Sequence, residues 1–207
     1  EPPTNICTLG PESSSGTSTE STVLEVGDAK SGSFVSFEQA GVPKEWTTDI
    51  GILSINNEQT KHGNQSLEWQ WSDKAVLEVN DLQGLGLDPT TIDRTNYTQK
   101  TFRMWLHNNE AVADDPLRVE FYDDLGNLQY QYYVNLNFTG WRAASVKYRT
   151  DMTGDKSSQN LTSMKIIAPE NTCSGRLLLD FTDFTADKGV VTGADRQVPM
   201  AATGNTN

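Results

Sequence analysis

The chain has 207 residues, a formal net charge of -12 and an isoelectric point near 4.5. Binding to phosphate backbones requires clustered Lys and Arg, so this composition argues against nucleic acid as a partner. No apolar run approaches the ~18 residues of a membrane span, so we expect no membrane insertion. No signal peptide is visible, which leaves a cytoplasmic protein or a sequence numbered after removal of its leader as alternatives.

The two ends of the chain differ in composition from its middle. Residues 10–22 are rich in Gly, Ser, Thr and Glu, and such a segment cannot bury a core. We therefore predict that residues 1–30 form a flexible tail. Residues 186–207 lack hydrophobic periodicity and end in small polar residues, so residues 187–207 are predicted to be a linker. Residues 31–186 are predicted to form one domain.

The body of the chain shows no helix-length periodic segment but about ten short runs of strand length, separated by Gly, Asn and Asp. These runs are residues 32–38, 50–56, 65–71, 75–80, 101–108, 117–123, 128–136, 141–149, 162–168 and 176–184. The sequence DDLGNLQ at 123–129 predicts a hairpin between two of them. A helical turn is expected at 88–93, inside the longest connection. The pattern predicts an all-β antiparallel sandwich, with a jelly roll as the favoured topology.

The run 65–71 contains two of the five tryptophans and alternates strictly. Leu67, Trp69 and Trp71 lie on one side of such a strand, with polar residues on the other. One apolar face with a period of two is typical of a sandwich strand that packs on the core. We therefore predict that Trp69 and Trp71 are core residues and do not bind a ligand.

The two cysteines are Cys7 and Cys173, and the only histidines are His62 and His107. Two cysteines are too few for a structural zinc site. The alternatives are two unpaired thiols or a disulfide that ties the N-terminal tail to the body. We expect the disulfide, because the rest of the chain is typical of a secreted protein.

Four segments in order carry a resemblance to a known family. HGNQSLEWQW (62–71), TFRMWLHN (101–108), NFTGWRAASV (137–146) and MKIIAPENTCSGRLLLDFTDFT (164–185) are similar to the N-terminal domain of bacterial chondroitin sulfate and hyaluronan lyases, chiefly of the chondroitinase ABC type. The similarity runs from about residue 34 to residue 186. ADRQVP (194–199) then resembles the start of the linker into the catalytic domain of those enzymes.

The resemblance implies a calcium ion that pins the loops and strand ends. It places the ligands on the first strand, on the loop before residue 65 and on the last strand. The residues carried over are Ser36, Glu38, Asn57, Lys61 (through its carbonyl) and Asp180. Calcium takes oxygen ligands, and a carboxylate that interrupts an apolar run, as Asp180 does, needs a partner or a metal. The alternative is that these carboxylates are solvated or hydrogen-bonded without metal.

A sugar-binding face is the second candidate site. The run 101–108 places Arg103, Trp105 and His107 on the side opposite three apolar residues. Sugar rings need flat aromatic faces, and acidic sugars need cationic donors. The candidate ligand-binding residues are Arg103, Trp105, His107, Arg118, Tyr133, Lys147 and Arg149. The alternatives are that Trp105 is structural, or that sugar binds at edge loops near Trp46 and Tyr97.

The resemblance therefore implies a non-catalytic carbohydrate-binding module of a secreted bacterial glycosaminoglycan lyase. We expect a monomer that binds chondroitin sulfate or hyaluronan chains and delivers them to a catalytic domain of the same polypeptide by raising their effective concentration. No catalytic residue is placed in this chain. The alternative is a structural domain that packs on the catalytic toroid without sugar affinity of its own, which the acidic charge favours.

Overall fold

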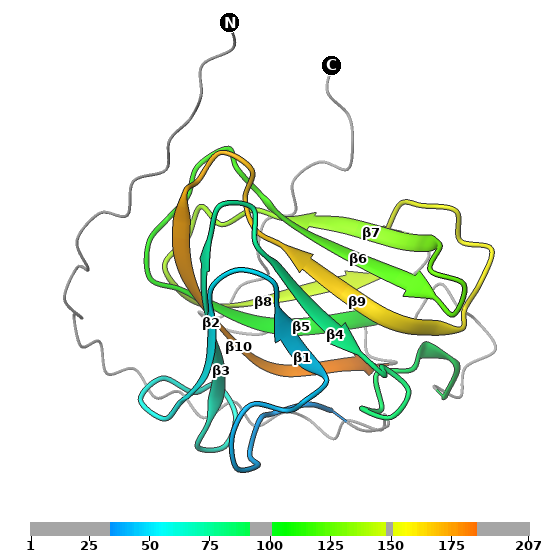
Figure 1. The fold of residues 1–207 in the computed structure, drawn as a ribbon, viewed down its shortest axis with the longest axis horizontal. Helices are drawn as coiled ribbons and strands as arrows, with labels where there is room; N and C mark the ends of the chain where they lie inside the picture. The colour runs from blue at the N-terminus through cyan, green and yellow to red at the C-terminus, as the bar shows by residue number, and fades with distance from the viewer. Residues whose placement is uncertain (1–33, 92–100, 148–150, 186–207) are drawn as a thin grey trace, which may run out of the picture.

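A computed structural model describes residues 34–91, 101–147 and 151–185. Two five-stranded antiparallel sheets stack face to face, so the predicted all-β sandwich is confirmed (Figure 1). Sheet I has the strand order β1-β4-β9-β6-β7, and sheet II has the order β2-β3-β10-β5-β8. The strands are β1 (Trp46–Thr48), β2 (Ile52–Asn56), β3 (Ser66–Ser72), β4 (Val76–Asn80), β5 (Thr101–Asn108), β6 (Leu117–Asp123), β7 (Leu128–Val134), β8 (Gly140–Lys147), β9 (Leu161–Ile167) and β10 (Ser174–Thr185).

Nine of the ten predicted runs correspond to strands, and the first does not. In the run 32–38 the structure describes one isolated bridge, between Val35 and Thr182. The strand β1 was not predicted, because its three residues are too short to show a periodic pattern. The predicted helical turn is a short 3-10 helix, η1 (Pro89–Thr91), and the predicted hairpin joins β6 to β7. The predicted tail at 1–30 and linker at 187–207 lie outside the described residues.

The core fills the space between the two sheets. Trp69 has no exposed surface and Trp71 has 3% of its surface exposed, so the prediction that both are core residues is confirmed. Trp69 also donates a hydrogen bond from Nε1 to Thr48 Oγ1 at 3.1 Å, which ties β3 to β1 of the other sheet. Trp71 lies opposite Gly175 of β10, and a Cβ atom on that glycine would come within 2.2 Å of the indole ring. The core therefore requires glycine at this position.

A second, smaller apolar cluster lies on the outer face of sheet II. Trp105, Ala143 and Phe181 are buried there, with Trp141 packed against them. Phe181 has a φ of 37° and Phe37 has a φ of 58°, and both values are unusual for bulky residues. The two strained residues flank the bridge between Val35 and Thr182. Strain of this kind persists where the surroundings hold the backbone in place, and functional sites are enriched in it.

No helix in the described part of the chain is long and apolar enough to span a membrane.

Candidate functional site: two outer sheet faces

The predicted ligand-binding residues divide between the two outer faces of the sandwich. Strand register places Arg103, Trp105 and His107 of β5, together with Lys147 of β8, on the outer face of sheet II. Arg118 of β6 and Tyr133 of β7 are direct cross-strand partners on the outer face of sheet I. Arg149 lies outside the described residues. A single surface therefore cannot contain the whole predicted set.

The outer face of sheet II is closed at the predicted tryptophan. Trp105 is only 4% exposed, and the Lys61 ammonium lies 4.2 Å from the centre of its ring. Arg103 is committed to Asp183, with Nη2–Oδ2 at 2.7 Å and Nε–Oδ1 at 3.0 Å. Burial and then the charge of Arg176 lower the pKa of His107 to about 4, so its imidazole is neutral at pH 7. On this side Trp105 is thus covered, Arg103 is paired and His107 is uncharged, and Lys147 is the predicted residue that stays exposed.

The outer face of sheet I is open and rich in tyrosine. Tyr122 and Tyr133 are both half-buried, and they lie on the neighbouring strands β6 and β7. The Lys165 ammonium of β9 lies 5.1 Å from the centre of the Tyr122 ring. Arg118 and Tyr122 are separated by four residues on one strand, or ~13 Å. This length suits an extended sugar chain better than a single ring.

The charged groups of this face form one network around Glu120. The Arg118 Nε lies 2.9 Å from Glu120 Oε1, and the Tyr122 hydroxyl donates a hydrogen bond to Glu120 Oε2. Burial and this hydrogen bond raise the pKa of Tyr122 to about 12, so the phenol stays protonated. Partial burial acts to lower the pKa of Arg118, but a hydrogen bond with Tyr133 and the charge of Glu120 outweigh it.

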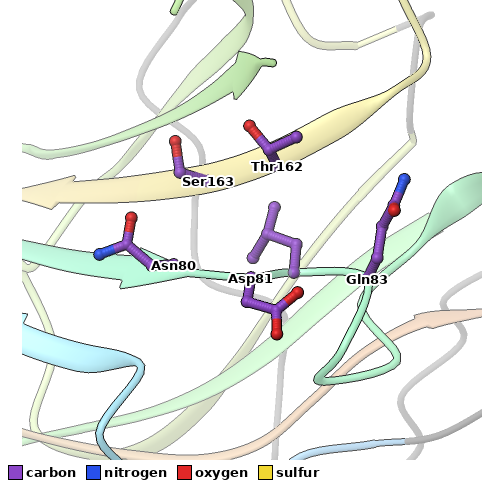
Figure 2. Close-up of a pocket in the computed structure, with 6 residues that line it drawn as sticks. Asn80, Asp81, Gln83, Thr162 and Ser163 are labelled. Carbon is purple, nitrogen blue, oxygen red and sulfur yellow. The ribbon is translucent and has the colours of Figure 1, made fainter.

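A shallow polar pocket continues the face of sheet I past Tyr122. Its lining comes from the end of β4 and the start of β9: Asn80, Asp81, Leu82, Gln83, Thr162 and Ser163. Asn80 pairs with Ser163, which pairs in turn with Tyr122, so the pocket and the tyrosine share one row across the sheet. Figure 2 shows the side chains of Asn80 and Ser163 extending to the same side of their neighbouring strands. These groups offer uncharged hydrogen-bond partners next to an aromatic ring.

Sequence reasoning missed Lys165, Asn80 and Ser163 as parts of this face. Each lies on the polar side of an alternating strand, which was the available signal. Alternation shows that a residue faces away from the core, but it does not show which strands are neighbours. The row that joins the pocket to Tyr122 exists only in the paired sheet.

The structure brings together three predicted metal-site elements: Glu38, Asp180 and the loop that contains Lys61. Asp180 Oδ2 accepts hydrogen bonds from the amides of Lys61 at 2.7 Å and His62 at 2.8 Å, and Oδ1 accepts one from Phe181 at 2.7 Å. The His62 N–H and the Lys61 carbonyl belong to one trans peptide and point in opposite directions. The Lys61 carbonyl therefore points away from the Asp180 carboxylate.

Glu38 binds the other end of the same loop. Its carboxylate accepts hydrogen bonds from the amides of Asn64 and Gln65, both at 3.0 Å. A Cβ atom on Gly63 would come within 2.4 Å of this carboxylate, so glycine allows the close approach. The two carboxylates thus hold the loop between them. The structure gives no contact of Ser36 with this group.

Main-chain oxygens converge beside Glu38. The side-chain amide of Gln65 lies 2.7 Å from the oxygen of Phe37, 3.0 Å from that of Gln39 and 3.3 Å from Asn57 Oδ1. The nitrogen of this amide faces the main-chain oxygens, so Gln65 donates two hydrogen bonds. Main-chain oxygens are also ligands that a hard cation takes, so those of Phe37 and Gln39 fit a cation as well as these two donors. No cluster of three or more His, Cys, Asp or Glu side chains suited to a metal occurs among the residues that the structure describes.

Cys173 lies in the turn before β10 and is disulfide-bonded. The main-chain amide of Asp73 donates a hydrogen bond to the Cys173 carbonyl oxygen at 2.8 Å. The other predicted member of the pair, Cys7, lies outside the described residues. The pairing of Cys7 with Cys173 stays a prediction.

Comparison with known proteins identifies related sequences. Residues 31–200 match the family model described as the N-terminal domain of lyases. The chain is 34% identical over 175 residues to a chondroitin sulfate ABC exolyase of Bacteroides thetaiotaomicron, covering 83% of this chain and 16% of the relative. It is 34% identical over 134 residues to a chondroitin sulfate ABC exolyase of Proteus vulgaris, covering 65% of this chain and 12% of the relative. The chain therefore spans less than a fifth of the relatives it matches.

Among solved structures, an exo-beta-agarase superposes with a TM-score of 0.54 and 10% sequence identity, over 72% of this chain and 24% of the agarase chain. At this identity the similarity shows the fold alone.

Proposed function

Because the chain belongs to the family of lyase N-terminal domains, we propose that it is a non-catalytic carbohydrate-binding domain of a secreted polysaccharide lyase. Its ligand is a glycosaminoglycan chain of the chondroitin sulfate or hyaluronan type, and the catalytic domain of the same polypeptide is its partner. The relatives named chondroitin sulfate ABC exolyases support this class of ligand. The observation that carries the proposal is the open tyrosine-containing face of sheet I.

The binding mode follows from the groups on this face. Tyr122 and Tyr133 offer aromatic surface for the C–H faces of sugar rings, as an aromatic side chain with a polar tip does. Asn80 and Ser163 offer hydrogen bonds to ring hydroxyls at one end, and Arg118 does so at the other. A shallow face buries little of each ring, so single-site affinity is modest. Attachment to a catalytic domain makes the second contact intramolecular, which compensates for weak binding.

The test is titration calorimetry of this chain with chondroitin and hyaluronan octasaccharides. We expect saturable binding, and a loss of about fivefold to tenfold in affinity for Tyr133→Ala and for Tyr122→Ala. Lys147→Ala is the control, because this exposed lysine was predicted to bind sugar but lies on the outer face of sheet II. Equal binding by the tyrosine variants, with a loss for Lys147→Ala, places the site on sheet II and contradicts the proposal.

A structural calcium ion is part of the proposal. The oxygens that would hold it are the main-chain oxygens of Phe37 and Gln39, Asn57 Oδ1 near the Gln65 side chain, and the Glu38 carboxylate, which binds the Gln65 amide N–H. Calcium takes six to eight such oxygens. Bound there, it would fix the strained backbone at Phe37 and the loop before β3. Asp180 acts on the same loop through hydrogen bonds to its amides.

A second candidate function is packing against the catalytic domain, and a specific observation favours it for sheet II. This sheet carries the apolar cluster of Trp105, Ala143 and Phe181 outside the main core. Phe34, which stacks on Phe181 with ring centroids 4.7 Å apart, is 42% exposed. The exposed part of Phe34, at the edge of this buried cluster, suits a contact with another domain. The two functions use opposite faces of the sandwich, so one does not exclude the other.

A further inference from the structure

The charge arrangement on the outer face of sheet I bears on which glycosaminoglycan it selects. We propose that this face binds unsulfated stretches of the chain in preference to sulfated ones, because its carboxylates adjoin and outnumber its cations. The inference rests on the proposed function, since it concerns the selectivity of the same face. It reverses the usual expectation that a glycosaminoglycan site is a cluster of free cations.

The strands of sheet I place two cations on this face, Arg118 and Lys165. Arg118 lies 2.9 Å from Glu120, and its Nη1 lies 3.9 Å from the largely exposed Glu170. In the strand register Lys165 lies opposite Glu78 of β4 on one side and Glu120 of β6 on the other, and its ammonium lies over the Tyr122 ring. Side chains directly opposite in neighbouring strands lie close enough to interact. Within the described part of this face, three carboxylates therefore surround two cations, and Arg118 is the cation with ion pairs to them.

A sulfate group gains nothing from such a surface. It loses hydration when it binds, and a buried or half-buried anion needs a free donor or cation to compensate. On this face it would have to displace Glu120 from Arg118, or lie beside uncompensated carboxylates. Like charges placed together suppress the wrong partner, which is how electrostatics produce specificity.

The lining of the pocket at the end of the face also contains no cationic side chain. Asn80 and Ser163 are uncharged, and the one ionisable group in the lining is Asp81. One Asp81 oxygen accepts a hydrogen bond from the Gly84 amide at 3.0 Å, so the carboxylate is held in place. Such a pocket suits hydroxyl or acetamido groups and disfavours a sulfate ester.

The experiment compares two octasaccharides with one backbone, unsulfated chondroitin and chondroitin 4-sulfate, by calorimetry of this chain at 50 mM and 500 mM NaCl. At 50 mM NaCl we expect the sulfated chain to bind at least about threefold more weakly. At 500 mM the gap should narrow, because salt screens repulsion as well as attraction. The unsulfated chain, which carries only its uronate carboxylates, should change less with salt than the sulfated chain does.

Charge variants extend the test to the face itself. Glu120→Gln removes one carboxylate at nearly constant shape, and we expect it to shift the ratio of the two affinities toward the sulfated chain by about threefold. Glu78→Gln does the same beside Lys165, and it keeps the test valid if Glu120→Gln does not fold. Glu110→Gln removes an equal charge at an exposed position after β5 and should leave the ratio unchanged.

The outcomes separate the inference from the proposed function. Tighter binding of the sulfated chain that weakens steeply with salt overturns the inference and supports glycosaminoglycan binding. An unchanged ratio in both Glu120→Gln and Glu78→Gln also overturns the inference. Absence of binding to either octasaccharide overturns the proposed function itself.

Discussion

Asp183 binds Arg103 through both carboxylate oxygens, in a bidentate pair whose acidic partner has only 1% of its side chain exposed. The pair joins β10 to β5 just past the bulge between Asp180 and Asp183. Arg103 was expected to bind sugar, and the structure instead commits its guanidinium to a buried carboxylate. The contact explains why an arginine lies on the side of β5 that carries the second apolar cluster, since the Arg103 guanidinium also lies 4.9 Å from the Phe181 ring.

Arg103→Ala should therefore report on stability. It leaves a buried carboxylate without its main cation, which costs about 3 kcal/mol of unfolding free energy. Urea unfolding measures this loss. The control is Lys44→Ala, which removes an exposed ion pair with Glu45 at 3.8 Å and should change stability by less than ~0.5 kcal/mol. If Arg103→Ala keeps full stability but loses sugar affinity, Arg103 binds sugar and does not act mainly as the partner of Asp183.

Gly175→Ala should destabilise the core through Trp71. The added methyl group would come within 2.2 Å of the buried indole ring, so the tryptophan or the strand must move. Overpacking of this kind costs about 1–3 kcal/mol. A matched control is Gly126→Ala in the β6–β7 turn, where a Cβ meets nothing within 4 Å and the cost is the strain of positive φ, ~1 kcal/mol. Equal melting temperatures for the two variants would mean that the core accommodates a methyl group beside Trp71, which contradicts the prediction.

The contribution of Asp180 to the free energy of unfolding should decrease as pH rises. Burial raises the pKa of this carboxyl to about 6, against the opposing effect of the amides of His62, Lys61 and Phe181. The folded state therefore holds a proton that the unfolded state releases near pH 4. The stabilisation is complete below about pH 4 and is lost as pH rises through about 6, by at most ~3 kcal/mol.

The measurement is the difference in unfolding free energy between the native chain and Asp180→Asn, at pH 4 and pH 7 in chelator. Asparagine cannot titrate, so the advantage of the native chain should shrink from pH 4 to pH 7. An advantage that grows with pH would mean that the three amide hydrogen bonds outweigh burial. Subtraction of the variant removes the titration of all other groups.

Calcium should stabilise the chain if the oxygens beside Glu38 bind it. At a calcium concentration 100 times the dissociation constant, the gain is about 2.7 kcal/mol. Calorimetric melting in calcium and in chelator measures it, and magnesium is the control because it dehydrates reluctantly. Glu38→Gln should abolish most of the gain. Identical melting curves in calcium and chelator would remove the metal from the proposal.

The strand pattern and the core could be read from the sequence because Cβ atoms alternate along a strand. The alternation of Leu67, Trp69 and Trp71 was enough to place both tryptophans inside, and the run 101–108 separated Met104 from Trp105 correctly. The short strand β1 was not predicted, because three residues are too few to show an alternating pattern. The first run failed as a strand because Phe37 adopts positive φ after the single bridge at Val35.

The sequence by itself determined which residues avoid the core, because that depends on local periodicity. Only the tertiary structure decided what those residues face. Arg103 and Arg118 have the same alternating surroundings, yet register places them on opposite sides of the sandwich. Lys61 reaches over Trp105 from a loop far away in sequence, and Glu120 collects Arg118 and Tyr122 into one network. Such contacts depend on which strands pair and in what register, and a period of two carries no information about either.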